Sequence, residues 1–287
     1  MSDLAKSMSS ATIFLHSKGD PIGSPIGTAF IVAYPLPEKP GKYFPLIVTA
    51  KHVVGDATEV VGRFSRKSGP IGTVSYDLDQ LRKDGDLWEH PDDGVDLLVF
   101  RSPHFEEVDY LPLAITNIAS KETFTKEEIA PTDRVVFPCL LVNFMGTTRN
   151  YPIIRDGSIA LIPDEPVPLE YNVGKRHIVT SQQIVMIDAT SIPGASGCPI
   201  FLWPGPRAKG GVYSLNGVKS WLLGVMHGFY QLPRETREVR IPIQAGVSTV
   251  FDENTQIAIM FPSWRLLEIL NSDKMKERIN ALAANIT

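Results

Sequence analysis

Short apolar runs rich in β-branched residues, broken by glycine, proline and aspartate, limit the folds that this chain can adopt. Such runs occupy residues 27–33, 44–49, 96–100, 133–137, 183–187, 198–202, 221–226 and 256–260. Runs of this length with frequent turn residues are typical of strands in an all-β sandwich or barrel. The proline-rich segment 35–41 predicts a long hairpin tip between the first two of these strands.

Helical periodicity is convincing only near the C-terminal end. Apolar residues recur at helical spacing from Trp264 to Leu282, and Ser263 before them is predicted as the N-cap. We therefore expect one or two C-terminal helices packed on a β body. The polar stretch 121–128 is the best candidate for a connection between two halves of that body.

Composition and charge exclude several classes of function. Hydrophobic residues make up 43% and charged residues 21% of the 287 residues, with a net charge of −4. A chain without a basic field is not expected to bind nucleic acid or anionic lipid. It has no apolar run of about 18 residues, the length needed for a membrane-spanning helix.

The redox and targeting signals favour a cytoplasmic protein. Residues 1–7 carry an early acid and no apolar core, unlike a secretory signal. Cys139 and Cys198 are the two cysteines, and both are expected to be reduced thiols. Cys198 could sense oxidation if exposed, although a buried packing role is favoured. The usual zinc, phosphate-loop and dinucleotide motifs are absent from the sequence, so neither a metal nor a cofactor is expected.

One glycine-rich segment, 191–199, has the pattern of a nucleophile turn. Gly194 and Gly197 flank Ser196, which allows a tight turn that exposes its hydroxyl. The N–H groups of Gly194 and Ser196 are predicted to form an oxyanion hole. The spacing differs from the nucleophile elbow of an α/β-hydrolase, which needs glycine two places after the serine.

A base and an acid are available in the first half of the chain. His52 is predicted to end an apolar strand, 46–52, so that its ring projects into a cleft. Asp96 begins the apolar run 96–100, which suits a buried acceptor for a histidine N–H. Asp92 and Asp93 are nearby rivals for this role. Taken alone, each of these residues has an ordinary structural explanation, whereas together they supply the groups of a serine-protease triad.

Four ordered blocks resemble the bacterial trypsin-like serine peptidases of the chymotrypsin superfamily. They are residues 27–32, 48–52, 93–99 and 194–199. The family blocks read Gly-Ser/Thr-Gly/Ala-Phe, Thr-Ala-x-His, Asp-x-Ala-x-Leu and Gly-x-Ser-Gly-x-Pro. Weaker matches are residues 151–160 and 258–262, so the resemblance extends over about residues 10 to 270. Four blocks in the same order are more specific than any single motif.

The resemblance implies a fold, a division of the chain and an activity. The fold would be a chymotrypsin-like double β-barrel, all-β, with two six-stranded antiparallel barrels and a C-terminal helix. Residues 10–120 would form the N-terminal barrel with His52 and Asp96, and residues 121–262 the C-terminal barrel with Ser196 and the oxyanion hole. Residues 263–287 would be a helical segment. The implied enzyme is a serine endopeptidase that works through an acyl-enzyme intermediate.

The resemblance also implies a substrate pocket, and this chain differs from some members of the superfamily at one position. Zymogen-activated digestive enzymes carry aspartate where Ala195 stands, so a cleavage switch of that type is not expected. The pocket would be lined by Thr190 and Ser191 before the nucleophile, and by Met226, His227 and Gly228 on a later strand.

His227 has more than one interpretation. Some relatives that select Glu or Gln use a histidine on this strand, one residue earlier relative to the glycine. Because a one-residue offset reverses the face of a strand, His227 could instead contact Asp96 or simply pack. All three interpretations stay open at this stage.

Two alternatives to an autonomous protease are also open. One is a protease-fold module that binds a peptide without cutting it. The other is a latent protease that a regulatory protein activates. In each case the expected partner is a protein or peptide, and neither nucleic acid nor a membrane.

Overall fold

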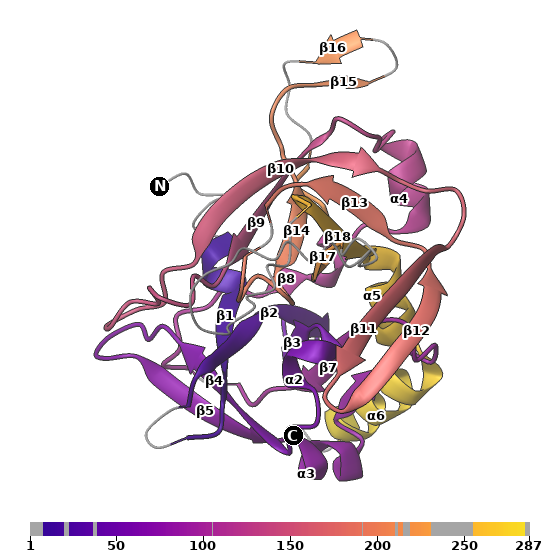
Figure 1. Ribbon diagram of the computed structural model, residues 1–287. Coiled ribbons are helices and arrows are strands. Elements are labelled where there is room, and N and C mark those ends of the chain that lie inside the picture. Colours follow the sequence, from indigo (N-terminus) through magenta and orange to yellow (C-terminus); the bar gives the residue numbers. More distant parts are fainter. Residues whose placement is uncertain are drawn as a thin grey trace, which may run out of the picture.

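The computed structural model describes residues 8–19, 23–36, 39–104, 106–190, 192–209, 212–214, 219–230 and 255–284. Strands dominate these residues and form two main bodies, an open N-terminal sheet and a closed C-terminal barrel (Figure 1). The expectation of a mostly β protein is therefore confirmed.

The N-terminal body is an eight-stranded sheet. Its strands are β1 (Thr12–Ser17), β2 (Pro25–Pro35), β3 (Tyr43–Thr49), β4 (Glu59–Phe64), β5 (Gly72–Asp77), β6 (Leu87–Glu89), β7 (Leu98–Arg101) and β8 (Leu113–Ala114). They pair in the order β5-β4-β1-β2-β3-β7-β6, and β8 pairs with β2 in parallel. The predicted hairpin joins β2 to β3, with the Leu36 N–H donating to the Lys42 carbonyl oxygen at 3.0 Å.

This sheet is not the closed six-stranded barrel that the resemblance implies. In the described part of the chain, the strand pairing ends at β5 and β6. The local sequence gives the reason. β5 runs directly into helix α3 (Leu78–Asp84), which is capped by the Asp77 side chain accepting from the Gln80 N–H at 2.8 Å. The chain therefore leaves the sheet before β5 can meet the three-residue strand β6.

The C-terminal body confirms the expected six-stranded antiparallel barrel. It closes in the order β10-β13-β18-β17-β14-β9. The strands are β9 (Arg134–Cys139), β10 (Ile153–Leu161), β13 (Val185–Asp188), β14 (Pro199–Leu202), β17 (Leu222–Phe229) and β18 (Ile257–Pro262). Side chains such as Phe137, Ile187 and Met260 fill its interior and are fully buried. Closure of the barrel gives the nucleophile segment before β14 a rigid support.

Two hairpins extend from the barrel. β11 (Val167–Val173) and β12 (Arg176–Gln182) form the first, between β10 and β13, and β11 packs against the short helix α2 (Lys51–Val54). β15 (Arg207–Lys209) and β16 (Val212–Ser214) form the second, which projects away from the two bodies in Figure 1. The first hairpin matters for the site, because it contacts helix α2 and the loop at Gly94, both in the N-terminal half of the chain.

The helices are short. Besides α2 and α3, the helices include the 3₁₀ turn η1 (Ile115–Asn117), α4 (Lys121–Lys126), α5 (Ser263–Leu270) and α6 (Asp273–Ala284). α4 lies in the polar stretch predicted as a connection, between β8 and β9. The two C-terminal helices confirm the sequence prediction, but Ser263 is not the N-cap. Ser263 is the first helical residue, and its hydroxyl donates to the Ala119 carbonyl oxygen at 2.6 Å.

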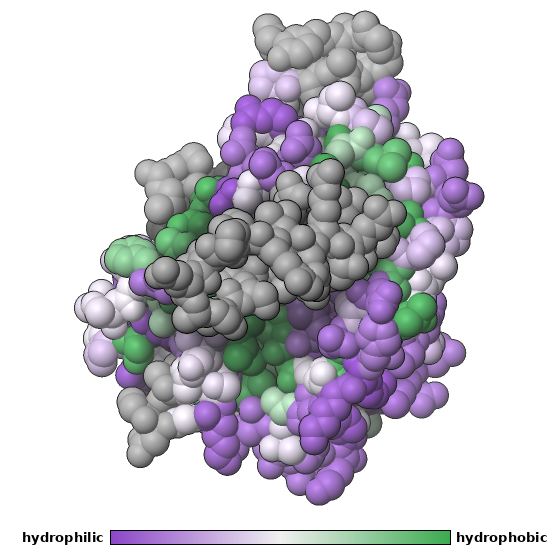
Figure 2. Space-filling view, viewed as in Figure 1, coloured by the Kyte–Doolittle hydropathy of each residue, from purple (hydrophilic) through white to green (hydrophobic). Residues whose placement is uncertain are grey.

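One hydrophobic core joins the two bodies. It contains Val48 and Leu97 from the N-terminal half, Phe201 and Phe261 from the barrel, and Leu266 from α5. In Figure 2, apolar residues come to the surface near the centre of the face, close to this junction, while polar residues prevail below and to the right. Among the described helices, none combines the length and the apolar character required to cross a membrane.

Candidate active site

His52 lies in the short helix that follows β3. The strand ends at Thr49, and the backbone turns at Ala50 into α2, so the prediction that His52 ends a strand is wrong. The neighbouring Lys51 is buried, and its ammonium donates to the carbonyl oxygen of Asp93 at 2.7 Å. The helix is thereby fixed to the loop that carries the acid. A place at the start of a helix also leaves the His52 backbone N–H without an intrahelical partner.

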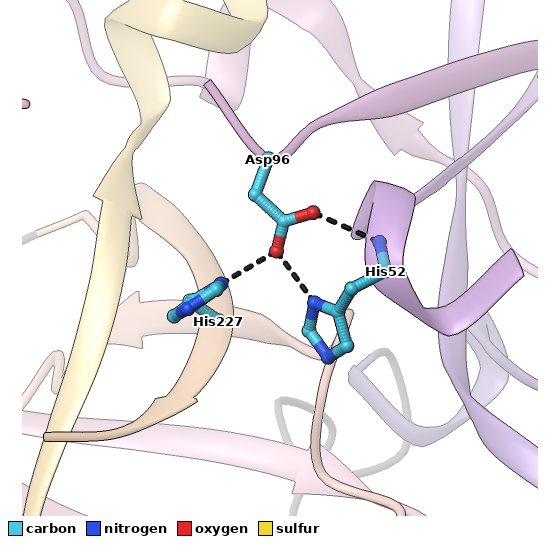
Figure 3. A group of neighbouring side chains, drawn as sticks. All are labelled: His52, Asp96 and His227. Carbon is cyan, nitrogen blue, oxygen red and sulfur yellow. Dashed lines mark hydrogen bonds and ion pairs between the residues drawn. The ribbon is translucent and has the colours of Figure 1, made fainter. Parts of the chain in front are cut away.

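Asp96 accepts hydrogen bonds from both the backbone and the ring of His52. Its Oδ1 accepts from the His52 backbone N–H at 2.9 Å, and its Oδ2 from Nδ1 at 2.6 Å (Figure 3). The Asp96 side chain has 0% exposed surface, whereas that of His52 has 24%. Asp92 instead accepts from Gly94 and Gln182, and Asp93 is exposed and pairs with Lys51. Of the three candidate acids, Asp96 is therefore the one that orients His52.

Each member of this pair shifts the pKa of the other. Burial alone would raise the pKa of Asp96, but the charges and hydrogen bonds of His52 and His227 outweigh it and hold that pKa well below its usual range. Burial alone would lower the pKa of His52, but the charge and hydrogen bond of Asp96 raise it. The acid is thus ionised, and Nδ1 of His52 is its donor, since a carboxylate only accepts hydrogen bonds.

Two consecutive turns present Ser196. They span residues 192–195 and 195–198, and each is closed by a hydrogen bond of 3.0 Å between its end residues. Gly194 and Gly197 occupy the third positions with φ of 93° and 82°, a conformation that favours glycine. A Cβ at Gly197 would also lie 2.2 Å from the Thr28 carbonyl oxygen. The glycines that flagged this segment in the sequence are therefore required by its backbone.

The predicted oxyanion amides have no hydrogen-bond acceptor in the part of the chain that the structure describes. Within the described ranges, neither the Gly194 nor the Ser196 N–H donates a hydrogen bond, whereas the Gly197 N–H donates to the Met226 carbonyl oxygen at 2.8 Å. Two amides without a partner among the described residues, beside a partly exposed serine, are what an oxyanion would need. Their role in catalysis stays a prediction.

Thr28 holds this turn segment, a role that sequence reasoning missed. Its hydroxyl donates to the Gly194 carbonyl oxygen at 2.6 Å and accepts from the Leu140 N–H at 2.9 Å. Its backbone N–H donates to the Ser196 carbonyl oxygen at 3.0 Å. Thr28 belongs to the first of the four family-like blocks, but nothing in the sequence indicates which later segment it contacts.

The structure contains one of the two side-chain hydrogen bonds expected of a triad. Asp96 and His52 are joined, whereas the Ser196 hydroxyl donates to the His227 carbonyl oxygen at 2.9 Å. No hydrogen bond joins Ser196 to His52 among the residues that the structure describes. His52 and Ser196 nevertheless share a neighbour, because the His52 and His227 ring centroids lie 5.1 Å apart. Hydrogen bonds of catalytic groups are often incomplete before substrate binds.

The residues predicted for the substrate pocket lie in different settings. Met226 is fully buried in the barrel, while Thr190 and Gly228 are partly exposed, and Ser191 lies outside the described residues. The ring of His227 is directed at the acid, with Nδ1 2.5 Å from Oδ2 of Asp96. Of the interpretations left open by the sequence, contact with Asp96 is thus present. The pocket itself stays a prediction.

One potential metal-ligand atom from each of His52, Asp96 and His227 lies within 4.8 Å of the other two. Histidine and carboxylate are common zinc ligands, but tetrahedral ligands about 2.0–2.1 Å from the metal are roughly 3.3 Å apart. The nitrogen–oxygen contacts here are 2.5 and 2.6 Å, the lengths of strong hydrogen bonds. The group is therefore arranged as a hydrogen-bonded cluster.

Both cysteines are unpaired and buried, as the sequence predicted for reduced thiols. Burial raises the pKa of Cys139 to about 12 and that of Cys198 well above its ordinary value. Because the thiolate is the reactive form, burial leaves Cys198 inert, and its role is that of a packing residue.

Comparison with known proteins gives similarity of structure only. No protein-family model and no curated protein sequence matches this chain. A serine endoprotease from Yersinia pestis matches with 14% identity and a TM-score of 0.48, over 96% of this chain and 65% of that one. The HtrA-type protease AlgW with a decapeptide matches with 12% identity and a TM-score of 0.47, over 93% and 65%. This chain thus spans about two thirds of the length of each of these structures.

Proposed function

We propose that this protein is a serine endopeptidase with His52, Asp96 and Ser196 as its catalytic triad. The observation that carries the proposal is the buried Asp96, which accepts from both the backbone and the ring of His52. The nearby Ser196 stands on a two-glycine turn whose Gly194 and Ser196 amides have no other described partner. This combination supplies an acid, a base, a nucleophile and an oxyanion site.

The proposed reaction begins when the Ser196 hydroxyl leaves the His227 carbonyl and turns to Nε2 of His52. Ser196 Oγ attacks the peptide carbonyl carbon while its proton passes to Nε2, and the new oxyanion accepts from the Gly194 and Ser196 N–H groups. The carbon–nitrogen bond then breaks, and His52 returns the proton to the leaving amine. A water molecule repeats the sequence on the acyl-enzyme, which releases the acid and regenerates Ser196.

In this proposal the chain divides as the sequence suggested. Residues 10–120 supply the base and acid, residues 121–262 supply the nucleophile, and residues 263–287 form a helical segment. The substrate is a peptide or protein that binds across the junction. The alternative of a non-cleaving, partner-controlled binding module has less support, because the His52–Asp96 pair is intact and the turn amides are available.

Cleavage of a complex peptide mixture tests this function without knowledge of the natural substrate. The purified protein is incubated with a library of peptides, and new termini are detected by mass spectrometry. Wild type and the Ser181→Ala control, a serine exposed on β12, should create the same new termini. Ser196→Ala should create none. New termini that persist in Ser196→Ala would overturn the proposal.

A further inference from the structure

We infer that His227 is a positioning residue that shares the Asp96 carboxylate with His52, so that the base is held by a histidine–aspartate–histidine unit. The catalytic consequence of this inference rests on the proposed function, whereas the sharing itself does not. His227 Nδ1 and His52 Nδ1 lie 2.5 and 2.6 Å from the same oxygen, Oδ2 of Asp96. Figure 3 shows the two rings converging on that oxygen from different sides.

The protons of this unit follow from the chemistry of the carboxylate. An ionised carboxylate only accepts hydrogen bonds, so Nδ1 of each histidine must carry a proton. Asp96 then accepts three hydrogen bonds, two at Oδ2 and one at Oδ1 from the His52 backbone. When neutral, His52 is left with an unprotonated Nε2, which is the atom that must take the proton of Ser196.

The ring of His227 is held in place by aromatic contacts. Its centroid lies 4.7 Å from that of Tyr171 on β11 and 5.7 Å from that of Phe261 on β18, both edge to face. The Tyr171 hydroxyl in turn donates to the Gly94 carbonyl oxygen at 3.0 Å, two residues before Asp96. Only 11% of the His227 side chain is exposed. The hairpin β11–β12 therefore fixes both the second histidine and the loop of the acid.

The same residue reaches the nucleophile through its backbone. The carbonyl oxygen of His227 accepts from the Ser196 hydroxyl at 2.9 Å, while its ring donates to Asp96. A residue that only lined a substrate pocket would need neither contact. His227 therefore bridges the acid and the nucleophile.

The other charged groups around the unit are paired outside it. Asp93 pairs with Lys51 from α2 and Arg176 from β12, at 3.1 and 3.2 Å. Asp92 accepts from Gly94 and Gln182, and Tyr171 faces the unit from β11 as an uncharged phenol whose pKa is raised by burial. Among the described residues, Asp96 is thus left to the two histidine rings and the His52 backbone N–H as its hydrogen-bond donors.

This arrangement has a consequence for the base. The His227 N–H donates to the same carboxylate oxygen as His52. This second hydrogen bond weakens the electrostatic interaction between Asp96 and His52. Removing this donor leaves more of the carboxylate charge to act on His52, so the pKa of His52 should rise. A purely packing role for His227 would leave that pKa unchanged when the ring is replaced by one of similar shape.

The test is an NMR titration of ¹⁵N-labelled histidines in wild type, His227→Phe and His227→Asn, with no substrate present. Phenylalanine keeps an aromatic ring against Tyr171 but has no donor, whereas asparagine restores an N–H donor at the δ position. We expect a higher His52 pKa in His227→Phe and a value close to wild type in His227→Asn. In assays, kcat should fall by about tenfold in His227→Phe, as for loss of one hydrogen bond to a charged group, with a smaller change in KM.

The outcomes separate this inference from the proposed function. An unchanged His52 pKa in folded His227→Phe overturns the sharing of Asp96, even if the enzyme cuts peptides. A raised pKa in a protein whose Ser196 proves unreactive upholds the sharing and counts against the protease. If His227→Phe does not fold, the proton NMR spectrum of wild type tests the inference by itself. Two strongly downfield Nδ1–H proton resonances, from His52 and His227, support the inference, and a single one from His52 overturns it.

Discussion

The backbone N–H of Thr28, on β2 of the N-terminal sheet, donates to the carbonyl oxygen of Ser196 at 3.0 Å. This bond joins the two bodies at the nucleophile, and the hydroxyl of Thr28 adds a bond to the carbonyl of Gly194. Both carbonyls belong to the turns whose amides are proposed to bind the oxyanion. The N-terminal sheet thus helps to orient a site built mainly on the barrel.

Thr28→Val should therefore weaken catalysis while preserving the shape of the side chain. The substitution removes the bond to Gly194 and leaves the buried Leu140 N–H unpaired, which costs about 1–3 kcal/mol of unfolding free energy. Loss of orientation at the oxyanion amides should lower kcat by roughly 10²-fold. Peptide-cleavage kinetics and urea unfolding measure the two effects. Thr28→Ser keeps the hydroxyl and should stay near wild type, and equal kcat values in both variants would argue against this role.

Gly197→Ala should disrupt the nucleophile turn by two mechanisms. The residue has a φ of 82°, and an added Cβ would meet the Thr28 carbonyl oxygen at 2.2 Å. Gly69→Ala is the matched control, because Gly69 has a φ of 81° but open space around its Cβ position. We expect the control to lose about 1 kcal/mol of stability and Gly197→Ala to lose more, together with activity. If both variants lost the same unfolding free energy, measured by thermal or urea unfolding, the close approach to Thr28 would not contribute to stability.

The pH profile of activity should report the His52–Asp96 pair. Only neutral His52 can accept the Ser196 proton, so kcat/KM should rise with pH through the pKa of His52. Because Asp96 raises that pKa, the rise should be centred above about 6.5, the ordinary value for histidine. In Asp96→Asn the raising charge is lost and burial remains, so the rise should move to lower pH, with kcat reduced roughly 10⁴-fold. A rise at the same pH in both proteins would contradict the pairing.

The sequence contains the local part of this structure but not the contacts between distant segments. The β-branched runs predict β2, β3, β7, β9, β13, β14, β17 and β18, because alternation and turn residues act over a few residues. The exit of β3 into α2 at Ala50 is decided by where Lys51 and His52 bond, on the loop around Asp96. For that reason the prediction of a strand that continues to His52 is wrong.

In the candidate site, too, the sequence predicts the local structure but not the contacts between distant segments. The turn around Ser196 can be predicted from its glycines, because the two turns need left-handed backbone at fixed positions. The contact of His227 with Asp96 joins residues 131 positions apart. The sequence offers it as one of several interpretations and does not decide between them. The packing of Tyr171 on His227 depends on a hairpin that the predicted strands did not include. Failure of the N-terminal sheet to close likewise depends on α3, which had no strong helical signal.

The measurement that tests the central claim most directly is labelling of the purified protein with a fluorophosphonate probe, followed by peptide mapping of the modified residue. An assembled triad makes Ser196 reactive, so wild type and Ser181→Ala should be labelled at Ser196 alone. Ser196→Ala and His52→Ala should not be labelled, although both should fold as wild type does. Correctly folded wild type that remains unlabelled, or labelling that persists without His52, would contradict the account.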